Sequence, residues 1–103
     1  MATKIELDKL IQYREHQIAS KSLTRKLDIE LPFMVYAMDA GESISNEQSS
    51  LTRIIQVLDG TLTVVIDQED NQVSANQMLV IPAGTLHEFQ ARQQCQFIQL
   101  ETK

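Results

Sequence analysis

The chain has 103 residues, which is enough for one domain and too few for two. Its net charge of −5 argues against nucleic acid as a partner, and no apolar run approaches the roughly 20 residues that span a membrane. The single cysteine, Cys95, cannot form an internal disulfide, and the N-terminus lacks the long apolar stretch of a signal peptide. We therefore expect a cytoplasmic protein.

The N-terminal segment carries a short helical pattern. Leu7, Leu10 and Ile11 would share one side of a helix, which predicts one or two helical turns within residues 5–13. From about residue 18 the pattern changes to that of strands, and residues 18–25 alternate weakly between apolar and polar.

Three basic residues follow in close succession, Lys21, Arg25 and Lys26, and they are interleaved with Leu23 and Leu27. We interpret them as the solvated side of a strand, with a phosphate or partner site as the alternative.

The middle of the chain predicts strands of different burial. Residues 27–31 alternate cleanly, as a half-buried strand would, and Pro32 then interrupts the pattern. Residues 33–38 are apolar on both faces and predict a strand that is covered on both sides. Residues 42–50 are the most polar segment and predict a loop or an edge strand across the mouth of a pocket.

Asp59-Gly60 stands between two apolar segments, residues 54–58 and 61–66. This dipeptide favours a type I′ turn, so a hairpin is predicted. After a turn at residues 67–71, further short strands are predicted at residues 72–74, 78–81, 87–91 and 96–100. About eight short strands without a long helix predict an all-β sandwich or barrel of antiparallel strands, such as a jelly roll.

The spacing of Pro82, Gly84 and His87, together with Val57-Leu58-Asp59-Gly60 upstream, resembles the single-domain cupins of the cupin 2 conserved barrel type. Their second motif reads Gly, five residues, Pro-x-Gly, two residues, His, three residues, Asn. Aligned with this chain, its first Gly falls on Asn76 and its final Asn on Ala91.

The first cupin motif reads Gly, five residues, His-x-His, three or four residues, Glu, six residues, Gly. Its two glycines fall on Gly41 and Gly60, but its histidines become Glu47 and Ser49, and its glutamate becomes Arg53. The resemblance runs from residue 41 to residue 91 without a gap. It implies a double-stranded β-helix, or jelly-roll barrel, over residues 18–103 with residues 1–17 as an N-terminal arm that holds the short helical turn. It also implies a homodimer.

The substituted positions bear directly on metal binding. In the family, three imidazoles and a carboxylate hold a divalent metal ion. Here His87 and, if it points inward, Glu47 can each donate a lone pair, whereas Ser49 is a poor ligand and Arg53 is a permanent cation without a lone pair. We therefore predict no tightly bound metal; a divalent transition metal held by His87 and Glu47 is the alternative.

Strand alternation places Glu47, Ser49 and Arg53 on one face, and the family's frame turns that face and His87 into the barrel. These four are the predicted ligand-binding residues. In one interpretation Arg53 pairs with Glu47, His87 bonds to a neighbour, and the group fills a site that has lost its metal. In the other, Arg53 and His87 receive an anionic group of a small ligand, and Glu47 orients Arg53.

The prediction for function is a barrel that binds a small molecule, an anionic one in the second interpretation, without a tightly bound metal. Two alternatives stay open. The first is a cupin-type enzyme, either a metal-dependent oxygenase or isomerase, or one that uses His87 as a general acid or base. The second is a structural dimeric module with a vestigial pocket.

Overall fold

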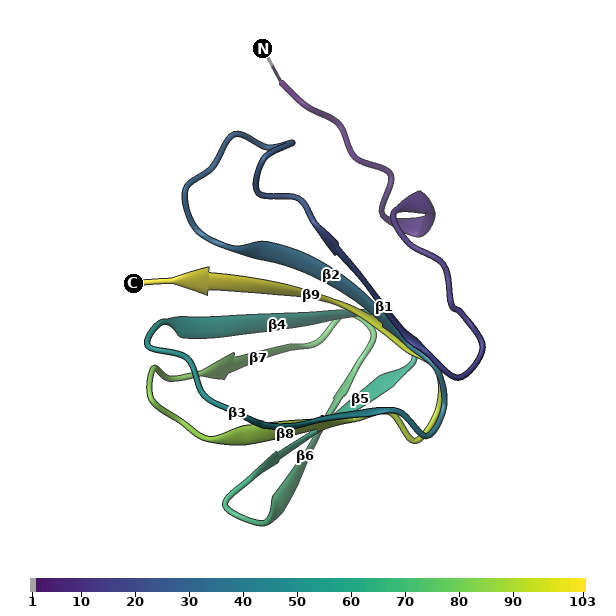
Figure 1. The fold of residues 1–103 in the computed structure, drawn as a ribbon, viewed down its shortest axis with the longest axis vertical. Helices are drawn as coiled ribbons and strands as arrows, with labels where there is room; N and C mark the ends of the chain where they lie inside the picture. Colours follow the sequence, from purple (N-terminus) through teal and green to yellow (C-terminus); the bar gives the residue numbers. More distant parts are fainter. Residues whose placement is uncertain (1) are drawn as a thin grey trace.

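A computed structural model describes residues 2–103 (Figure 1), and over these residues the chain is almost entirely β. A single 3₁₀ turn, η1 (Leu7–Lys9), precedes nine strands. The first five strands are β1 (Ile18–Ser22), β2 (Phe33–Met38), β3 (Ser43–Glu47), β4 (Thr52–Asp59) and β5 (Thr61–Ile66). The other four are β6 (Glu69–Ser74), β7 (Met78–Ile81), β8 (His87–Gln90) and β9 (Cys95–Thr102).

The strands form two antiparallel sheets that face each other. One has the order β1-β2-β9-β4-β7 and the other β3-β8-β5-β6. Because β9, from the end of the chain, lies between β2 and β4, the sheets are built from strands distant in sequence. This arrangement confirms the prediction of an all-β jelly-roll barrel with a short N-terminal helical turn.

The main core lies between the two sheets, because alternate residues of the central strands point inward. Strand β9 contributes Cys95 and Phe97, which are fully buried. Phe97 stacks on Tyr36 of β2, with ring centroids 5.0 Å apart, and meets the edge of Phe89 from β8 at 5.4 Å. These aromatic contacts join strands from both sheets and fix their spacing.

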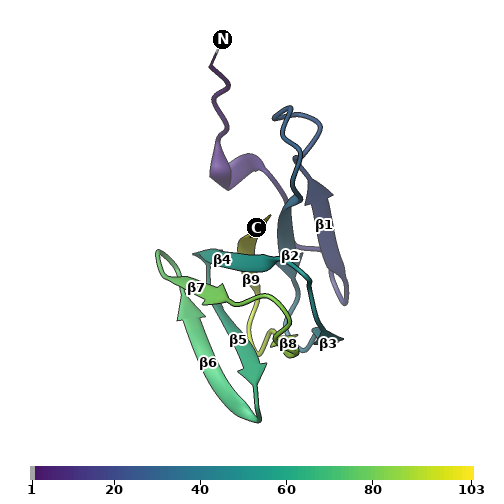
Figure 2. The same ribbon diagram turned by 90° about the vertical axis from the view of Figure 1, so that its left-hand side faces the viewer.

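A second, smaller core covers the outer face of the five-stranded sheet. Leu10 of the N-terminal arm packs there with Leu23 and Val35, and all three are buried. In both views of the ribbon the arm lies on the side of β1 and β2, away from β6 (Figures 1 and 2). No helix among residues 2–103 is long and apolar enough to cross a membrane.

The predicted hairpin at Asp59-Gly60 is wrong. Strand β4 pairs with β7 and β9, whereas β5 pairs with β6 and β8, so this turn carries the chain from one sheet to the other. Gly60 does adopt a positive φ of 73°, but a Cβ there would lie 2.2 Å from the carbonyl oxygen of Gln94. Close approach of the β8–β9 loop therefore accounts for this glycine.

The tight hairpin joins β5 and β6 instead. Its two connecting residues, Asp67 and Gln68, both have positive φ, 52° and 66°, as a type I′ turn requires. The sequence placed a turn here but did not mark it as a hairpin, because Gln68 stands where glycine or asparagine is usual.

The predicted strand at residues 27–31 is also wrong. These residues belong to a loop that turns back on itself: the amide of Leu27 donates to the carbonyl of Leu23 at 2.9 Å, and Asp28 has a φ of 54°. The alternation there reflects Leu27 packing onto the second core rather than membership of a sheet.

Candidate functional site

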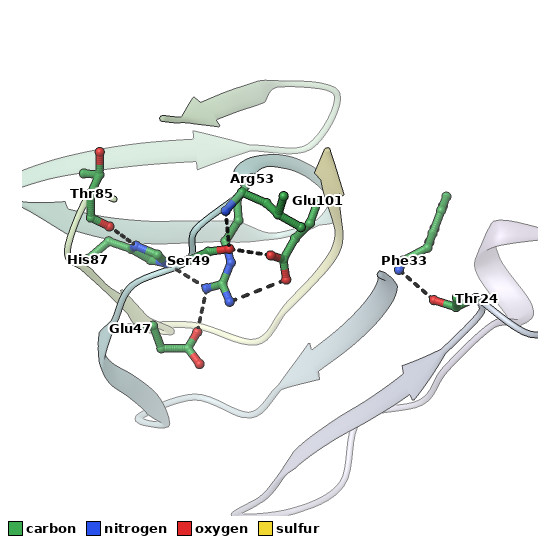
Figure 3. Close-up of polar contacts among 9 residues, drawn as sticks. Thr24, Phe33, Glu47, Ser49, Arg53, Thr85, His87 and Glu101 are labelled. Atoms are coloured by element: carbon green, nitrogen blue, oxygen red, sulfur yellow. Dashed lines mark hydrogen bonds and ion pairs between the residues drawn. The ribbon is translucent and has the colours of Figure 1, made fainter. Parts of the chain in front are cut away.

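Four side chains from four strands converge at one end of the barrel (Figure 3). Glu47 ends β3, Arg53 lies near the start of β4, His87 begins β8 and Glu101 lies near the end of β9. The register explains the convergence, because Glu47 lies opposite His87 and Arg53 lies opposite Glu101. Directly opposed residues of antiparallel strands share a face and lie close together.

A β-bulge brings Glu47 onto the inner face. Ile44 pairs with Phe89 and Glu47 pairs with His87, so three steps along β3 match two along β8. Asn46 supplies the bulge with a φ of 55°. The extra residue keeps Glu47 on the same side as Ile44, which packs against the main core.

The guanidinium of Arg53 occupies the centre of the cluster. Its Nη1 lies 3.0 Å from both Glu47 Oε1 and His87 Nε2, and its Nη2 lies 3.6 Å from Glu101 Oε1. The Arg53 side chain is 12% exposed and that of Glu101 13%, while Glu47 is the outermost member at 37%. One basic group is thus held by two acidic ones, so both terminal nitrogens are engaged.

His87 is 2% exposed and both of its ring nitrogens have partners. Nδ1 lies 2.9 Å from the carbonyl oxygen of Thr85, and Nε2 lies 3.0 Å from Arg53 Nη1. A carbonyl only accepts and a guanidinium only donates, so this geometry selects the neutral ring with its proton on Nδ1. The lone pair on Nε2 therefore points at Arg53.

The loop between β3 and β4 is tied to the turn that precedes β8. Ser49 donates its hydroxyl to Glu101 Oε2, and its carbonyl accepts from the amide of Gly84 at 2.7 Å. Gln48 Nε2 donates to the carbonyl of Gly84 at 2.6 Å. These bonds position the turn that places His87 beside Arg53, so Ser49 joins the cluster through Glu101.

Sequence reasoning missed Glu101 and Tyr36. Glu101 gave no local signal, because only the pairing of β4 with β9 sets it against Arg53. The pKa of Tyr36 is raised, first by burial and then by the nearby carboxylates of Glu47 and Glu101, and is partly lowered again by Arg53. Tyr36 therefore stays protonated near the cluster and can donate a hydrogen bond.

Two buried polar atoms near the cluster have no hydrogen-bond partner within residues 2–103: the donor Arg53 Nε and the acceptor Gln99 Oε1. Gln99 is 3% exposed and lies opposite Ile55. Ile55 and Gln99 are the next inward-facing pair of β4 and β9 after Arg53 and Glu101. Diagonal neighbours of this kind lie within about 8 Å. Buried polar groups are nearly always satisfied, so each of these two atoms is free to bond to a further group.

The donor set does not fit a divalent metal. Among the described residues, no three His, Cys, Asp or Glu side chains are grouped so that they could hold a metal ion. Glu47 and His87 do converge, but the Arg53 guanidinium lies within 3.0 Å of both and would repel a second cation. Cys95 lies at the opposite end of β9 from Glu101, and burial raises the pKa of its thiol to about 12.

Comparison with known proteins identifies the architecture. The sequence model described as Cupin domain matches residues 34–100. The conserved protein SPY1581 from Streptococcus pyogenes, of unknown function, is 25% identical, with a TM-score of 0.87 over 100% of this chain and 89% of that one. No curated protein sequence matches significantly.

Two further solved structures share the fold. A cupin superfamily protein from Desulfitobacterium hafniense is 19% identical, with a TM-score of 0.84 over 98% of this chain and 91% of that one. A cupin 2 conserved barrel domain protein from Leptotrichia buccalis is 23% identical, with a TM-score of 0.87 over 96% of this chain and 47% of that one.

Proposed function

This chain belongs to the cupin domain family, and from that premise we propose that its barrel binds a small, polar, uncharged molecule without a resident metal ion. The observation that carries the proposal is that two buried polar atoms, Arg53 Nε and Gln99 Oε1, have no hydrogen-bond partner within residues 2–103. Leaving a buried donor or acceptor unpaired costs about 1–3 kcal/mol. A hydroxyl or primary amide can accept from one atom and donate to the other, which would recover that energy on binding.

The charges around Arg53 support an uncharged ligand over the anionic one that the sequence suggested. Glu47 and Glu101 already engage both terminal nitrogens of the guanidinium. An incoming carboxylate would have to displace one of them and then lie beside the other, which is unfavourable. Since Glu47 is the most exposed member of the cluster, its movement is the simplest route of entry.

The same contacts argue against the enzyme alternatives. A general base needs a free lone pair, and the one on His87 Nε2 accepts from Arg53. The metal-dependent form would require the guanidinium to leave the space between Glu47 and His87.

The test is a thermal-shift screen of protein that has been purified without chelator and analysed for metals. The probes are three panels of small molecules: neutral polyols and amides, carboxylates, and amines. We expect neutral compounds to raise the Tm of the wild type and of the control Gln56→Leu, whose side chain is on the outer face, but not of Gln99→Leu. Stabilisation by carboxylates that depends on Arg53, or near-stoichiometric transition metal, would refute the proposal.

We also propose that the protein is a cytoplasmic homodimer. The cytoplasmic location is supported by the single cysteine, which is free and buried. Dimerisation is supported by an apolar row on the outer face of the five-stranded sheet, where Val80, Ile54, Leu100 and Phe33 lie opposite one another in successive strands. The other three residues of the row are half-buried, but Val80 is 55% exposed and Met78, on the same face of β7, is 62% exposed, and exposed apolar patches mark association surfaces.

A further inference from the structure

Strand β1 is an open edge of the five-stranded sheet. The amide of Leu23 donates to the carbonyl of Phe33, and the amide of Asp39 donates to the carbonyl of Gln17, so the odd-numbered residues of this segment bond to β2. Because hydrogen-bonded and free positions alternate along an antiparallel strand, the N–H and C=O groups of Ile18, Ser20 and Ser22 point away from β2. No other backbone hydrogen bond in the described part of the chain reaches them.

A groove runs along this edge. It has a volume of about 550 Å³ and lies between the N-terminal arm, residues 9–14, and the start of the sheet, residues 17–21. The arm is fastened on its far side, where Tyr13 donates its hydroxyl to Asp59 and Gln96 donates to the carbonyl of Ile11. Figure 1 shows the arm following β1 without joining the sheet. The groove is within the usual size of a binding site for a small ligand or a short segment of chain.

The groove and its continuation are basic. Arg14 and Lys21 line it, and Arg25 and Lys26 lie in the loop that follows β1. Within residues 2–103 none of these four takes part in an ion pair, whereas Lys9, also in the groove wall, is paired with Glu6.

The charge of the whole chain is divided unevenly around this feature. Residues 1–26 hold six basic and three acidic side chains, whereas residues 27–103 hold three basic and eleven acidic ones. The four unpaired basic residues in and near β1 therefore form a basic region on a protein that is acidic overall. Such a region would attract an acidic partner selectively.

We propose that β1 accepts an extended, acidic peptide segment of a partner protein as an added strand. The free backbone groups of Ile18, Ser20 and Ser22 supply the hydrogen bonds, and the cations at Arg14 and Lys21 select acidic side chains. Strand addition to an open sheet edge uses main-chain bonds for affinity and side chains for specificity. A second copy of this chain is disfavoured, because pairing two β1 edges would bring like charges together; an edge lysine commonly prevents such self-pairing.

The test measures binding of a fluorescein-labelled peptide of alternating valine and glutamate, blocked at both ends, by fluorescence anisotropy. We expect binding that falls steeply with salt, and slowed amide exchange at Ser20 and Ser22 in the complex.

Ser20→Pro removes an outward N–H while leaving the β1–β2 bonds intact, and it should abolish binding. The double variant Arg14→Glu, Lys21→Glu should weaken binding about tenfold or more, since two favourable charge pairs become repulsive. The matched control Lys4→Glu, Lys103→Glu should bind as the wild type does.

Each contrary result overturns the proposal. A peptide N-methylated at alternate residues cannot form the ladder, so its binding with unchanged affinity would exclude strand addition even if Ser20→Pro failed to fold. Equal binding of a valine–lysine peptide, or of a single-stranded oligonucleotide, would exclude the acidic-peptide specificity. The absence of binding at millimolar peptide would overturn the proposal. So would the finding that the protein alone forms a dimer that Ser20→Pro dissociates, because β1 would then pair with a second copy of the chain.

Discussion

Arg53 is the residue around which the candidate site is organised. It stands where the family's metal-binding motif has a glutamate, and its guanidinium bridges Glu47, His87 and Glu101. A buried charge requires partners of opposite sign, so the group is held together by one positive charge between two carboxylates.

Replacing Arg53 by methionine should therefore destabilise the protein strongly, because Glu47 and Glu101 would face each other without a counter-charge. We expect a loss of about 3 kcal/mol in the free energy of unfolding, measured by urea denaturation at neutral pH. The control Arg92→Met removes an exposed pair with Asp70 and should cost less than about 1 kcal/mol. Adding Glu47→Gln and Glu101→Gln to Arg53→Met should recover part of the loss. Equal stability of Arg53→Met and wild type would show that the cluster is not a stabilising unit.

Asp39 is a carboxylate from which we expect a contribution to acid sensitivity. Its carboxylate accepts from the amide of His16 at 2.7 Å and from Gln94 Nε2 at 3.0 Å, and these bonds, with a further one from the amide of Ala40, lower its pKa. A carboxyl whose pKa is lower in the folded state contributes stability above its ordinary pKa of 3.8, and loses it as the pH falls through the folded value.

We therefore expect Asp39→Asn to flatten the decline in the free energy of unfolding as the pH is lowered below 3.8. The measurement is urea denaturation at a series of pH values, with the same substitution at the exposed Asp8, Asp8→Asn, as the control. If Asp39→Asn declined as steeply as the wild type, acid sensitivity would have to come from other carboxylates.

At the scale of elements, the corner at Gly60 decides how the two sheets are joined. Asp59-Gly60 has the composition of a hairpin turn, yet the flanking strands β4 and β5 pair in different sheets. Local turn chemistry predicts that the chain bends, but not which strand it bends toward, because the partners of β4 are supplied by residues that follow much later.

Gly60→Ala should destabilise the protein more than Gly41→Ala, although both glycines have positive φ. A Cβ at Gly60 would meet the Gln94 carbonyl oxygen at 2.2 Å, whereas nothing lies within 4 Å of one at Gly41. We expect the difference in Tm to correspond to about 2 kcal/mol. Equal Tm values for the two variants would mean that the β8–β9 loop moves aside without cost.

The bulge in β3 is a second element that sequence reasoning could not place. Strict alternation over residues 47–57 put Glu47 and Arg53 on one face, and the structure does bring the two into contact. The contact depends on the bulge at Asn46 and on the loop of residues 48–51 between β3 and β4, not on one continuous strand. The period-2 pattern reports the face of each residue only while the strand stays regular.

For the whole molecule, the outer apolar row predicts association. Val80→Lys would place a charge at the most exposed position of the row, and we expect it to convert a dimer to a monomer. Sedimentation equilibrium measures this directly, and Leu86→Lys is the matched control, since Leu86 is equally exposed but lies outside the row. A monomeric wild type, or a dimer that survives Val80→Lys, would refute the assignment of this face.

The sequence alone determined the all-β class, the family and the position of most strands, because apolar residues in segments such as β2 and β5 are buried in the fold, and their pattern can be read locally. It also predicted that Ser49 and Arg53 stand at positions where the cupin motif has metal ligands, since the presence of a lone pair is a property of the residue type. Only the tertiary structure decided that Glu101 lies opposite Arg53 and Gln99 opposite Ile55, because cross-strand register joins residues more than forty positions apart. The open edge of β1 was likewise decided by strand order, which no single segment encodes.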